Sequence, residues 1–264
     1  MSKIALGTVQ FGMNYGISNT TGQVTSDEIA KILDYCKTNE IDTLDTAQGY
    51  GESEKVLSQF DLSDFKIITK LIGDARLETS LENLKLSSVY GLMFHRENEC
   101  NDKTWEQFES YKEQGLVKKI GVSVYTPNVL ESLIERYPIE IVQFPMNILD
   151  QSFVPLIPKL KEKNIEIHTR STFLQGLLLM EQIPEYFTPV KEKINSVPKP
   201  RLEHTLNFGK QQKAVDKMVL GVTRLQDLQE IVEAYSKELP ETDYSQYVIT
   251  DEKYINPSVW QVKK

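Results

Sequence analysis

Four polar residues that could act together in proton transfer stand at or just after the ends of successive predicted strands: Asp45, Tyr50, Lys70 and His95. A tyrosine hydroxyl is a weak acid with an ordinary pKa of about 10. A nearby ammonium lowers that pKa by stabilising the phenolate, and a carboxylate keeps the ammonium charged and oriented. An imidazole directs a substrate carbonyl toward the hydroxyl. The set therefore predicts general acid–base chemistry on a carbonyl or an alcohol, with Lys70 lowering the pKa of Tyr50.

Each of these residues taken alone has an ordinary structural explanation. Asp45 could cap a helix, Tyr50 could pack, Lys70 could end a solvated strand and His95 could be a hydrogen-bonded structural histidine. Their shared placement at strand ends favours a common functional use.

The elements that must position them are short apolar runs alternating with amphipathic segments. Eight runs predict strands, at 4–8, 43–47, 66–70, 90–95, 119–124, 140–144, 165–169 and 217–222. They are rich in β-branched residues and nearly continuously apolar, which is typical of parallel strands buried on both faces.

Amphipathic stretches between the runs predict helices, at 25–40, 104–115, 126–138 and 225–239. Thr25 followed by Glu28 has the spacing of a capping box at the first of them. Strict alternation favours a single (β/α)8 TIM barrel over residues 1–264 rather than a doubly wound sheet. The segment 181–216 predicts a loop with one or two helices, and the tail from about 240 is irregular. Chemistry in such a barrel sits at the C-terminal ends of the strands.

Composition excludes several classes of function. The net charge of −8 predicts no nucleic-acid partner and no attraction to an anionic membrane. No run approaches 18 apolar residues and the N-terminus does not resemble a secretory signal, so we expect a cytoplasmic protein without a membrane span. Cys36 and Cys100 predict free thiols, and no His, Cys, Asp and Glu spacing predicts a metal site. His168 and His204 are interpreted as a structural histidine in the barrel and a surface residue.

The motifs together resemble the aldo-keto reductase family over roughly residues 3 to 235. They are LGTVQFG at 6–12, LDTAQGYGESE at 44–54, ITK at 68–70, MFH at 93–95, GVSVY at 121–125, LQGLL at 174–178 and GVTRLQDLQE at 221–230. The resemblance implies a nicotinamide cofactor lying across the barrel mouth without a Rossmann domain. It also implies hydride transfer to a carbonyl carbon with Tyr50 as proton donor, or the reverse oxidation of an alcohol.

The resemblance further implies a set of cofactor contacts, with Ser123 and Gln143 holding the nicotinamide carboxamide. The whole set is Gly7, Thr8, Ser123, Gln143, Arg170, Ser171, Gln175, Gly221, Thr223, Arg224 and Asp227.

Four positions depart from the family pattern, and one of them is Ile231, which stands where members that bind the 2′-phosphate of NADP place an Asn. Val124 stands where Asn is usual, so one carboxamide contact is lost or moved. Arg170 stands where many members place an aromatic residue that stacks on the nicotinamide; its planar guanidinium could stack, or could point at a substrate phosphate or carboxylate. Asp227 would repel the 2′-phosphate of NADP, although Arg224 could substitute for the missing contact. Both NADP and NAD therefore remain open, with NADP the commoner choice in the family.

The substrate is expected to be a small carbonyl or alcohol. The segment RENECND at 96–102 leads directly to a helix, and an open mouth there would suit a sugar or a nucleotide sugar. Phe11 and Tyr15 are candidates for the substrate pocket. Two other functions stay open: a cofactor-binding sensor with little turnover, and a redox-neutral epimerase or lyase that regenerates its nicotinamide. The sequence indicates neither the reaction direction nor the oligomeric state.

Overall fold

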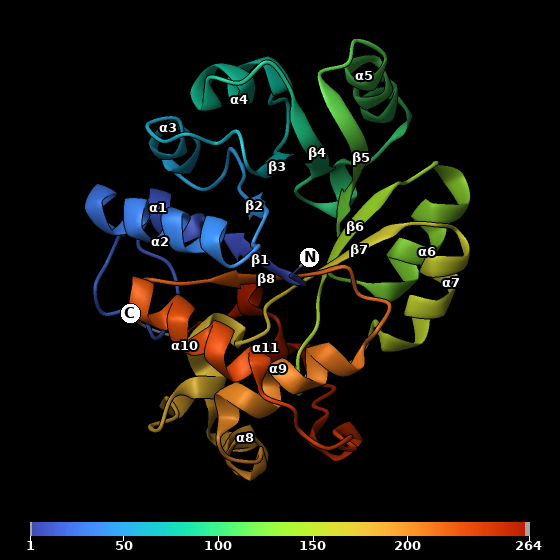
Figure 1. The fold of residues 1–264 in the computed structure, drawn as a ribbon. Helices are drawn as coiled ribbons and strands as arrows, with labels where there is room; N and C mark the ends of the chain where they lie inside the picture. The colour runs from blue at the N-terminus through green and yellow to red at the C-terminus, as the bar shows by residue number, and fades with distance from the viewer. Residues whose placement is uncertain (1, 262–264) are drawn as a thin grey trace.

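The computed structural model describes residues 2–261 and confirms the (β/α)8 class. Within these residues eight parallel strands pair in chain order, and the last strand pairs with the first, so the barrel is closed (Figure 1). Every strand begins and ends within two residues of its predicted bounds. The strands are β1 (Ile4–Gly7), β2 (Thr43–Asp45), β3 (Lys66–Leu71), β4 (Val89–Phe94), β5 (Val117–Ser123), β6 (Ile141–Pro145), β7 (Glu166–Arg170) and β8 (Lys217–Gly221).

Helices surround the barrel in a ring (Figure 1). The α-helices are α1 (Val9–Gly12), α2 (Ser26–Thr38), α3 (Ser53–Leu57), α4 (Leu77–Leu84), α5 (Asp102–Glu113), α6 (Pro127–Arg136), α7 (Ile157–Glu162), α8 (Lys191–Ser196), α9 (Arg201–Gln211), α10 (Leu225–Ser236) and α11 (Glu252–Ile255). Short 3-10 helices are η1 (Glu97–Glu99), η2 (Val154–Leu156), η3 (Leu174–Leu179), η4 (Glu185–Val190), η5 (Ser245–Tyr247) and η6 (Pro257–Val259).

The predicted capping box at the start of α2 is wrong. The Thr25 side chain accepts no capping hydrogen bond. Glu28 turns instead to α10, where its Oε1 accepts a hydrogen bond of 2.6 Å from the backbone N–H of Leu225. Amides in the first turn of a helix lack partners within the helix, so the carboxylate satisfies one of them. The contact joins the helix after β1 to the helix after β8.

Apolar side chains form two cores. The larger lies between the outer faces of the strands and the helices, and includes Leu44, Val122 and Phe144. A small cluster of Ile68, Met93 and Ile141 fills the barrel interior. The interior is therefore packed rather than open, as is usual for barrels of eight strands.

The N-terminal end of the barrel is held by a polar cluster around Glu166. Its carboxylate receives hydrogen bonds from the Tyr90 hydroxyl at 2.7 Å and from Lys119 Nζ at 2.6 Å, and it pairs with His168 Nε2 at 2.8 Å. These contacts hold the pKa of Glu166 well below its ordinary value in spite of its burial. His168 is thus fully buried and structural, and it is not among the residues that line the cavity.

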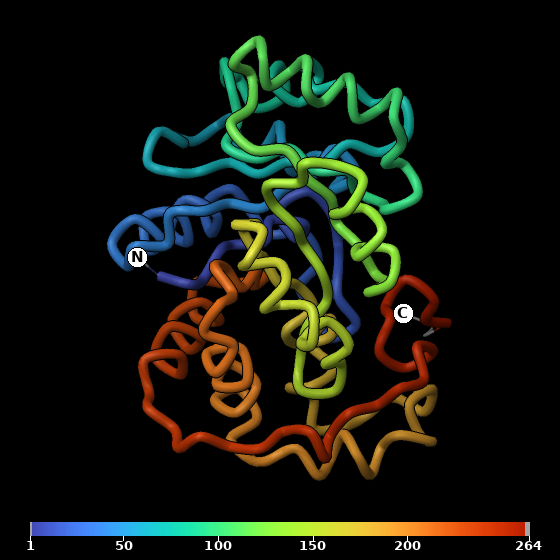
Figure 2. Tube along the Cα trace, turned by 90° about the vertical axis from the view of Figure 1, so that its right-hand side faces the viewer, coloured from blue at the N-terminus to red at the C-terminus, as the bar shows by residue number. Residues whose placement is uncertain are grey.

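The C-terminal segment packs on the barrel more regularly than its sequence suggests. Tyr244, Tyr247 and Tyr254 are buried, and the amide of Ile249 donates to Leu149 O at 2.8 Å. His204 Nδ1 lies 3.0 Å from the Tyr244 hydroxyl, and the residue is partly buried, so it lies at the surface with one side packed against this segment. Figure 2 shows the first and the last described residues of the chain at opposite ends of the barrel.

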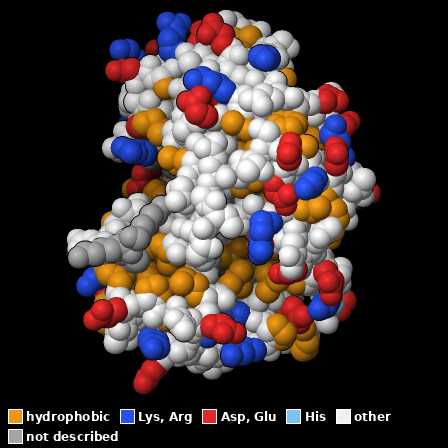
Figure 3. All heavy atoms as spheres, turned by 90° about the vertical axis from the view of Figure 1, so that its left-hand side faces the viewer, with side chains coloured by type: hydrophobic (Ala, Val, Ile, Leu, Met, Phe, Trp, Pro, Cys, Tyr) orange, Lys and Arg blue, Asp and Glu red, His pale blue; other side chains and the backbone are white. Residues whose placement is uncertain are grey.

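The outer surface has mixed charge. The face in Figure 3 carries acidic and basic side chains interspersed among apolar ones, without a field of one sign. Among residues 2–261 no helix combines the length and apolarity needed to cross a membrane.

Close backbone contacts fix the loop that carries Tyr50. A Cβ on Gly12 would lie 1.8 Å from Tyr50 O and 2.4 Å from Ser53 N, and one on Gly51 would lie 2.6 Å from Gly12 O. The amide of Glu52 donates to Gly12 O at 3.3 Å. Only glycine permits this approach of the loop after β1 to the loop after β2.

We expect Gly12→Ala to lower the free energy of unfolding by about 1–3 kcal/mol, the usual cost of overpacking, and to impair whatever function depends on Tyr50. Urea unfolding measures the first effect. Gly22→Ala is the control: its φ of +82° is strained for alanine, but nothing lies within 4 Å of the added Cβ. Unfolding midpoints that shift no more for Gly12→Ala than for Gly22→Ala would contradict the role of the close contact.

Candidate active site

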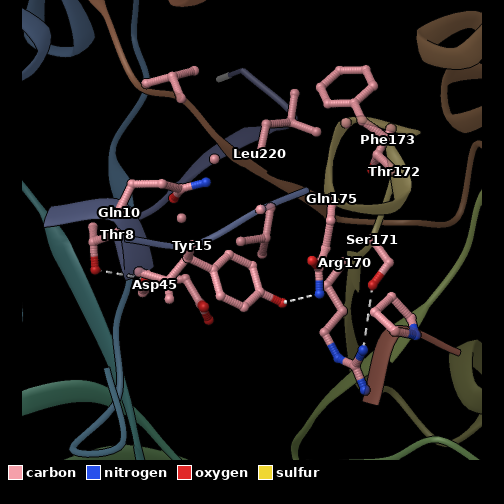
Figure 4. A pocket seen from close by; sticks show the side chains of 18 of the residues that line it. Thr8, Gln10, Tyr15, Asp45, Arg170, Ser171, Thr172, Phe173, Gln175 and Leu220 are labelled. Carbon is pink, nitrogen blue, oxygen red and sulfur yellow. Dashed lines mark hydrogen bonds between the residues drawn. The ribbon is translucent and has the colours of Figure 1, made fainter. Parts of the chain in front are cut away.

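The C-terminal ends of the strands surround one large cavity. Gly7, Asp45, Ser123, Arg170 and Gly221 each end their strands and line it. Its volume is about 1090 Å³. Figure 4 shows side chains from both sides of the barrel pointing into this space.

A buried ion pair forms the floor of the site. Lys70 Nζ lies 2.6 Å from Asp45 Oδ1, and the two side chains are 1% and 2% exposed. Lys70 also donates to Thr46 O at 3.1 Å, and the second oxygen of Asp45 accepts from Gln143 Nε2 at 2.7 Å. A buried ion pair is tolerated when hydrogen bonds satisfy the other donors and acceptors of the two groups. Thr46 and Gln143 supply such bonds here.

Tyr50 and His95 lie beside this pair. Lys70 Nζ is 5.1 Å from the centroid of the Tyr50 ring. The rings of Tyr50 and His95 meet edge to face with centroids 5.5 Å apart. Asp45, Tyr50 and His95 line the cavity, whereas Lys70 lies behind them. The structure therefore brings the four predicted residues together.

The electrostatics of Tyr50 differ from the prediction. Burial, and next the negative charge of Asp45, raise the pKa of Tyr50 above its ordinary value of 10.0. The expected net lowering of this pKa is therefore wrong for this structure, because the effect of burial dominates. Burial also lowers the pKa of Lys70, and Asp45 opposes that shift. At neutral pH the Tyr50 phenol is therefore protonated.

His95 is neutral for a related reason. Burial lowers its pKa to about 3, and the positive charges of Lys70, Arg170 and Arg96 add to that effect. Its Nδ1 is buried without a hydrogen-bond partner among the described residues. The site thus presents a neutral phenol and a neutral imidazole next to an ammonium.

Hydroxyl groups that the sequence did not single out hold the Tyr50 loop in place. The Ser53 Oγ donates to Thr8 O at 2.9 Å, and Thr46 Oγ1 lies 3.1 Å from Ser53 Oγ. Glu54 in α3 accepts from Thr69 Oγ1 at 2.6 Å. These contacts bind the loop to β1 and β3. The motif at 44–54 contains Ser53 and Glu54, but only the fold shows their partners.

All residues expected to contact a cofactor line the cavity. Gln143 is buried; its Nε2 donates to Asp45, while its Oε1 has no partner among residues 2–261. Gln10, which the sequence analysis did not select, lines the same cavity with a buried, unpartnered Oε1. Two unsatisfied acceptors in one cavity suit a polar ligand that carries N–H or O–H groups. The side chain of Val124 is fully buried and apolar, so it supplies no side-chain hydrogen bond to a ligand.

Carboxylates occupy the N-terminus of α10. Asp227 Oδ2 accepts from the amides of Thr223 at 3.0 Å and Arg224 at 3.1 Å, and Glu28 takes the amide of Leu225. Arg224 Nη2 lies 2.7 Å from Asp227 Oδ1. Arg224 was expected to be able to replace a missing phosphate contact, but in the structure its guanidinium is already paired with Asp227.

Two contacts shape the mouth of the cavity. Tyr15 reaches across it so that its hydroxyl accepts a hydrogen bond of 3.2 Å from Gln175 Nε2 (Figure 4). On the far side the guanidinium of Arg170 stacks on the Tyr125 ring, 4.0 Å from its centroid. Tyr15 was a pocket candidate and does line the cavity; Phe11, the other candidate, is fully buried in the core. Tyr125 was missed, although it follows Ser123 and Val124 in the GVSVY segment.

Comparison with known proteins places the chain among reductases. The model of the "Aldo/keto reductase family" matches residues 3–252. L-galactose dehydrogenase of Arabidopsis thaliana is 22% identical over 89% of this chain and 86% of its own length. The uncharacterized oxidoreductase YqkF of Bacillus subtilis is 24% identical over 50% of this chain, and the match spans about half, 49%, of that protein.

Solved structures share the fold. The holo form of the aldo-keto reductase AKR11C1 from Bacillus halodurans has a TM-score of 0.76 at 19% identity, covering 93% of this chain and 90% of that one. The glycerol dehydrogenase AKR11B4 from Gluconobacter oxydans has a TM-score of 0.72 at 18% identity, covering 90% and 88%.

Removing the ammonium from the buried pair should be costly. We expect Lys70→Met to lower the free energy of unfolding by about 3–5 kcal/mol, because it leaves the Asp45 carboxylate buried without its counterion. The double variant Asp45→Asn with Lys70→Met should recover part of that loss. Urea unfolding at neutral pH gives each value.

Lys55→Met is the matched control, since Lys55 pairs with Glu52 at 2.9 Å on the surface, where both side chains are more than half exposed. Its effect should stay within about 1 kcal/mol. Equal losses for Lys70→Met and Lys55→Met would show that the buried pair does not stabilise the fold.

Proposed function

Because the chain belongs to the aldo/keto reductase family, we propose that it transfers hydride between a nicotinamide nucleotide and the carbon of a carbonyl or secondary alcohol. The observation that carries this proposal is the protonated Tyr50 phenol beside the buried Lys70–Asp45 pair and the neutral His95. The nucleotide, when bound, would supply the hydride, and the residues of the chain would orient the substrate oxygen and donate a proton to it.

Tyr50 gives its proton to the carbonyl oxygen in the reductive direction. Negative charge then develops on the phenol oxygen, and the nearby ammonium of Lys70 stabilises that charge electrostatically. Asp45 keeps Lys70 charged and fixed through the 2.6 Å contact. His95 is neutral, so it can donate one hydrogen bond to the carbonyl oxygen and orient it toward Tyr50. In the oxidative direction the same phenol must first lose its proton, which its raised pKa disfavours at neutral pH.

The cavity residues fit a nicotinamide nucleotide. We assign the carboxamide to Ser123 and Gln143, since the free Oε1 of Gln143 accepts from an amide N–H. Gly7 and Gly221 end neighbouring strands and leave the backbone open to the ligand. Thr223, Arg224 and Asp227 at the start of α10 would meet the adenosine end, with Ser171 and Gln175 on the opposite wall.

Among the two nucleotides we favour NAD(H). A 2′-phosphate at the start of α10 would meet the Asp227 carboxylate, and the backbone amides there already donate to Asp227 and Glu28. A carboxylate instead accepts a hydrogen bond from a ribose 2′-hydroxyl, as it does in other NAD sites. Arg224 is already paired with Asp227, so its charge is in part compensated before any phosphate arrives.

We place the substrate among polyhydroxylated, sugar-like carbonyls and alcohols. Two proteins similar to this chain are named for L-galactose and glycerol. Tyr15 and Tyr125 are 37% and 36% exposed at the rim of the cavity, where their rings offer flat faces to a sugar ring.

The test of the proposed function is turnover by the Tyr50→Phe variant. We expect kcat for carbonyl reduction to fall by about 10²-fold or more, because the general acid is lost, while NADH still quenches or shifts protein fluorescence with an unchanged Kd. Tyr35→Phe, on α2 outside the cavity, should retain full activity. Undiminished reduction by Tyr50→Phe would remove the tyrosine from the mechanism.

The pH profile provides a second, independent check. The pKa of His95 is about 3 and that of Tyr50 is raised above 10.0. We therefore expect kcat/KM for reduction to stay level from about pH 5 to about pH 8, because neither group changes protonation there. A break near the ordinary histidine pKa of about 6.5 would contradict the neutral His95.

Cofactor choice is measured by titrating the protein with NADH and NADPH. We expect tighter binding of NADH, and we expect Asp227→Asn to strengthen NADPH binding by roughly tenfold, equal to about 1.4 kcal/mol, since it removes the repelling charge but keeps a capping oxygen. Glu233→Gln, on the same helix outside the cavity, should change neither affinity. Tighter NADPH binding by the unaltered protein would overturn the choice.

A further inference from the structure

The guanidinium of Arg170 has no counterion among the described residues. Arg170 ends β7 and lines the cavity, yet it forms no ion pair with any carboxylate among residues 2–261, and its hydrogen bonds go to neutral oxygens. Arg96, which also lines the cavity, forms no ion pair within residues 2–261 either, whereas Arg224 pairs with Asp227 and Arg136 pairs with Asp102. A positive charge that is partly buried and unpaired is costly unless a ligand compensates it.

The guanidinium is held in a defined orientation. Its Cζ lies 4.0 Å from the centroid of the Tyr125 ring, and Nη2 donates to Val124 O at 3.1 Å. Nη1 is 3.4 Å from Ser171 Oγ (Figure 4). A guanidinium carries five N–H donors in a planar fork, so donors remain after these two contacts. Stacking on Tyr125 and the bond to Val124 fix the plane of the fork before a ligand arrives.

The charges around Arg170 do not cancel it. Lys70 and Asp45 neutralise each other, and His95 is neutral. Asp150 is buried and feels the charge of Arg170, but it accepts hydrogen bonds from Ser152 and forms no ion pair with Arg170. Glu97 on the rim uses its Oε2 to accept the amides of Tyr125 and Thr126. Arg96 adds a second positive charge that faces His95. The inner part of the cavity therefore favours a negatively charged group.

We propose that Arg170 binds an anionic group, a carboxylate or a phosphate, that the substrate carries close to its reacting carbonyl. A planar fork with two adjacent N–H donors matches the two oxygens of either group. This inference rests on the proposed function and narrows its substrate class from sugar-like carbonyls to their acidic or phosphorylated forms. It also assigns to the substrate an arginine whose position alone suggests contact with the nicotinamide.

Binding of unreactive anions tests the inference without requiring turnover. Tartronate and 2-phosphoglycolate are titrated by calorimetry into the protein saturated with NADH, with glycerol as the neutral comparison. We expect saturable binding of at least one anion and none of glycerol. Arg170→Gln should weaken that binding by about 10- to 100-fold, the range for hydrogen bonds to a charged group, and Arg170→Lys should weaken it less.

Arg136→Gln is the matched control, because it removes the same charge from the exposed end of α6 and should leave anion binding unchanged. The Kd of NADH is measured for each variant in parallel. A loss of NADH affinity in Arg170→Gln, comparable with its loss of anion affinity, would assign Arg170 to the cofactor and overturn the proposal. So would equal anion binding by Arg170→Gln and the unaltered protein, or no anion binding at all.

Turnover then separates this inference from the proposed function. Two pairs are compared, D-glyceraldehyde with its 3-phosphate and D-glucose with D-glucuronate, which distinguish phosphate from carboxylate. We expect kcat/KM to favour one anionic member, and Arg170→Gln to abolish that preference. Reduction of neutral members only would contradict the anion site but keep the reductase. Anion binding without any turnover would support the anion site but contradict the proposed reductase activity.

Discussion

The buried contact between Lys70 and Asp45 is the constraint on which the site depends. It joins β3 to β2, and the second oxygen of Asp45 extends the link to Gln143 on β6. Two ions without water must have every remaining hydrogen-bonding group satisfied, so the positions of Thr46 and Gln143 are fixed along with the pair. Tyr50 and His95 are then placed against a floor that cannot shift without exposing a charge. Burial of this floor also explains why the phenol stays protonated and the imidazole stays neutral.

The barrel made much of this arrangement predictable. Parallel strands buried on both faces have continuous apolar sequences, and their C-terminal ends meet at one rim. The proximity of Asp45, Lys70 and His95 could therefore be predicted from their positions at strand ends. The cofactor contacts expected from the family resemblance lie along the same rim for the same reason, although their roles remain predictions.

Interactions that depend on distant partners were not predictable. Glu28 looked like half of a local capping box, but its partner Leu225 is on the last large helix. The direction of the Tyr50 pKa shift follows from burial, which a list of neighbouring charges does not reveal. The contact between His204 and Tyr244 was not predictable, because Tyr244 belongs to a tail without a clear sequence pattern. The pairing of Arg224 with Asp227 lies within one turn of helix. The sequence did not indicate that Asp227 also accepts hydrogen bonds from the amides of Thr223 and Arg224.

Closure of the sheet imposes an order in time on the growing chain. Ile4 in β1 pairs on one side with Met218 in β8, so 214 residues separate the two partners (218 − 4). At a synthesis rate of about 5–20 residues per second, the first strand waits roughly 10–40 s for its second neighbour. During that interval one edge of β1 offers unpaired backbone donors and acceptors to any other extended chain. The last strand thus completes not only the rim of the cavity but also the protection of the first strand of the barrel.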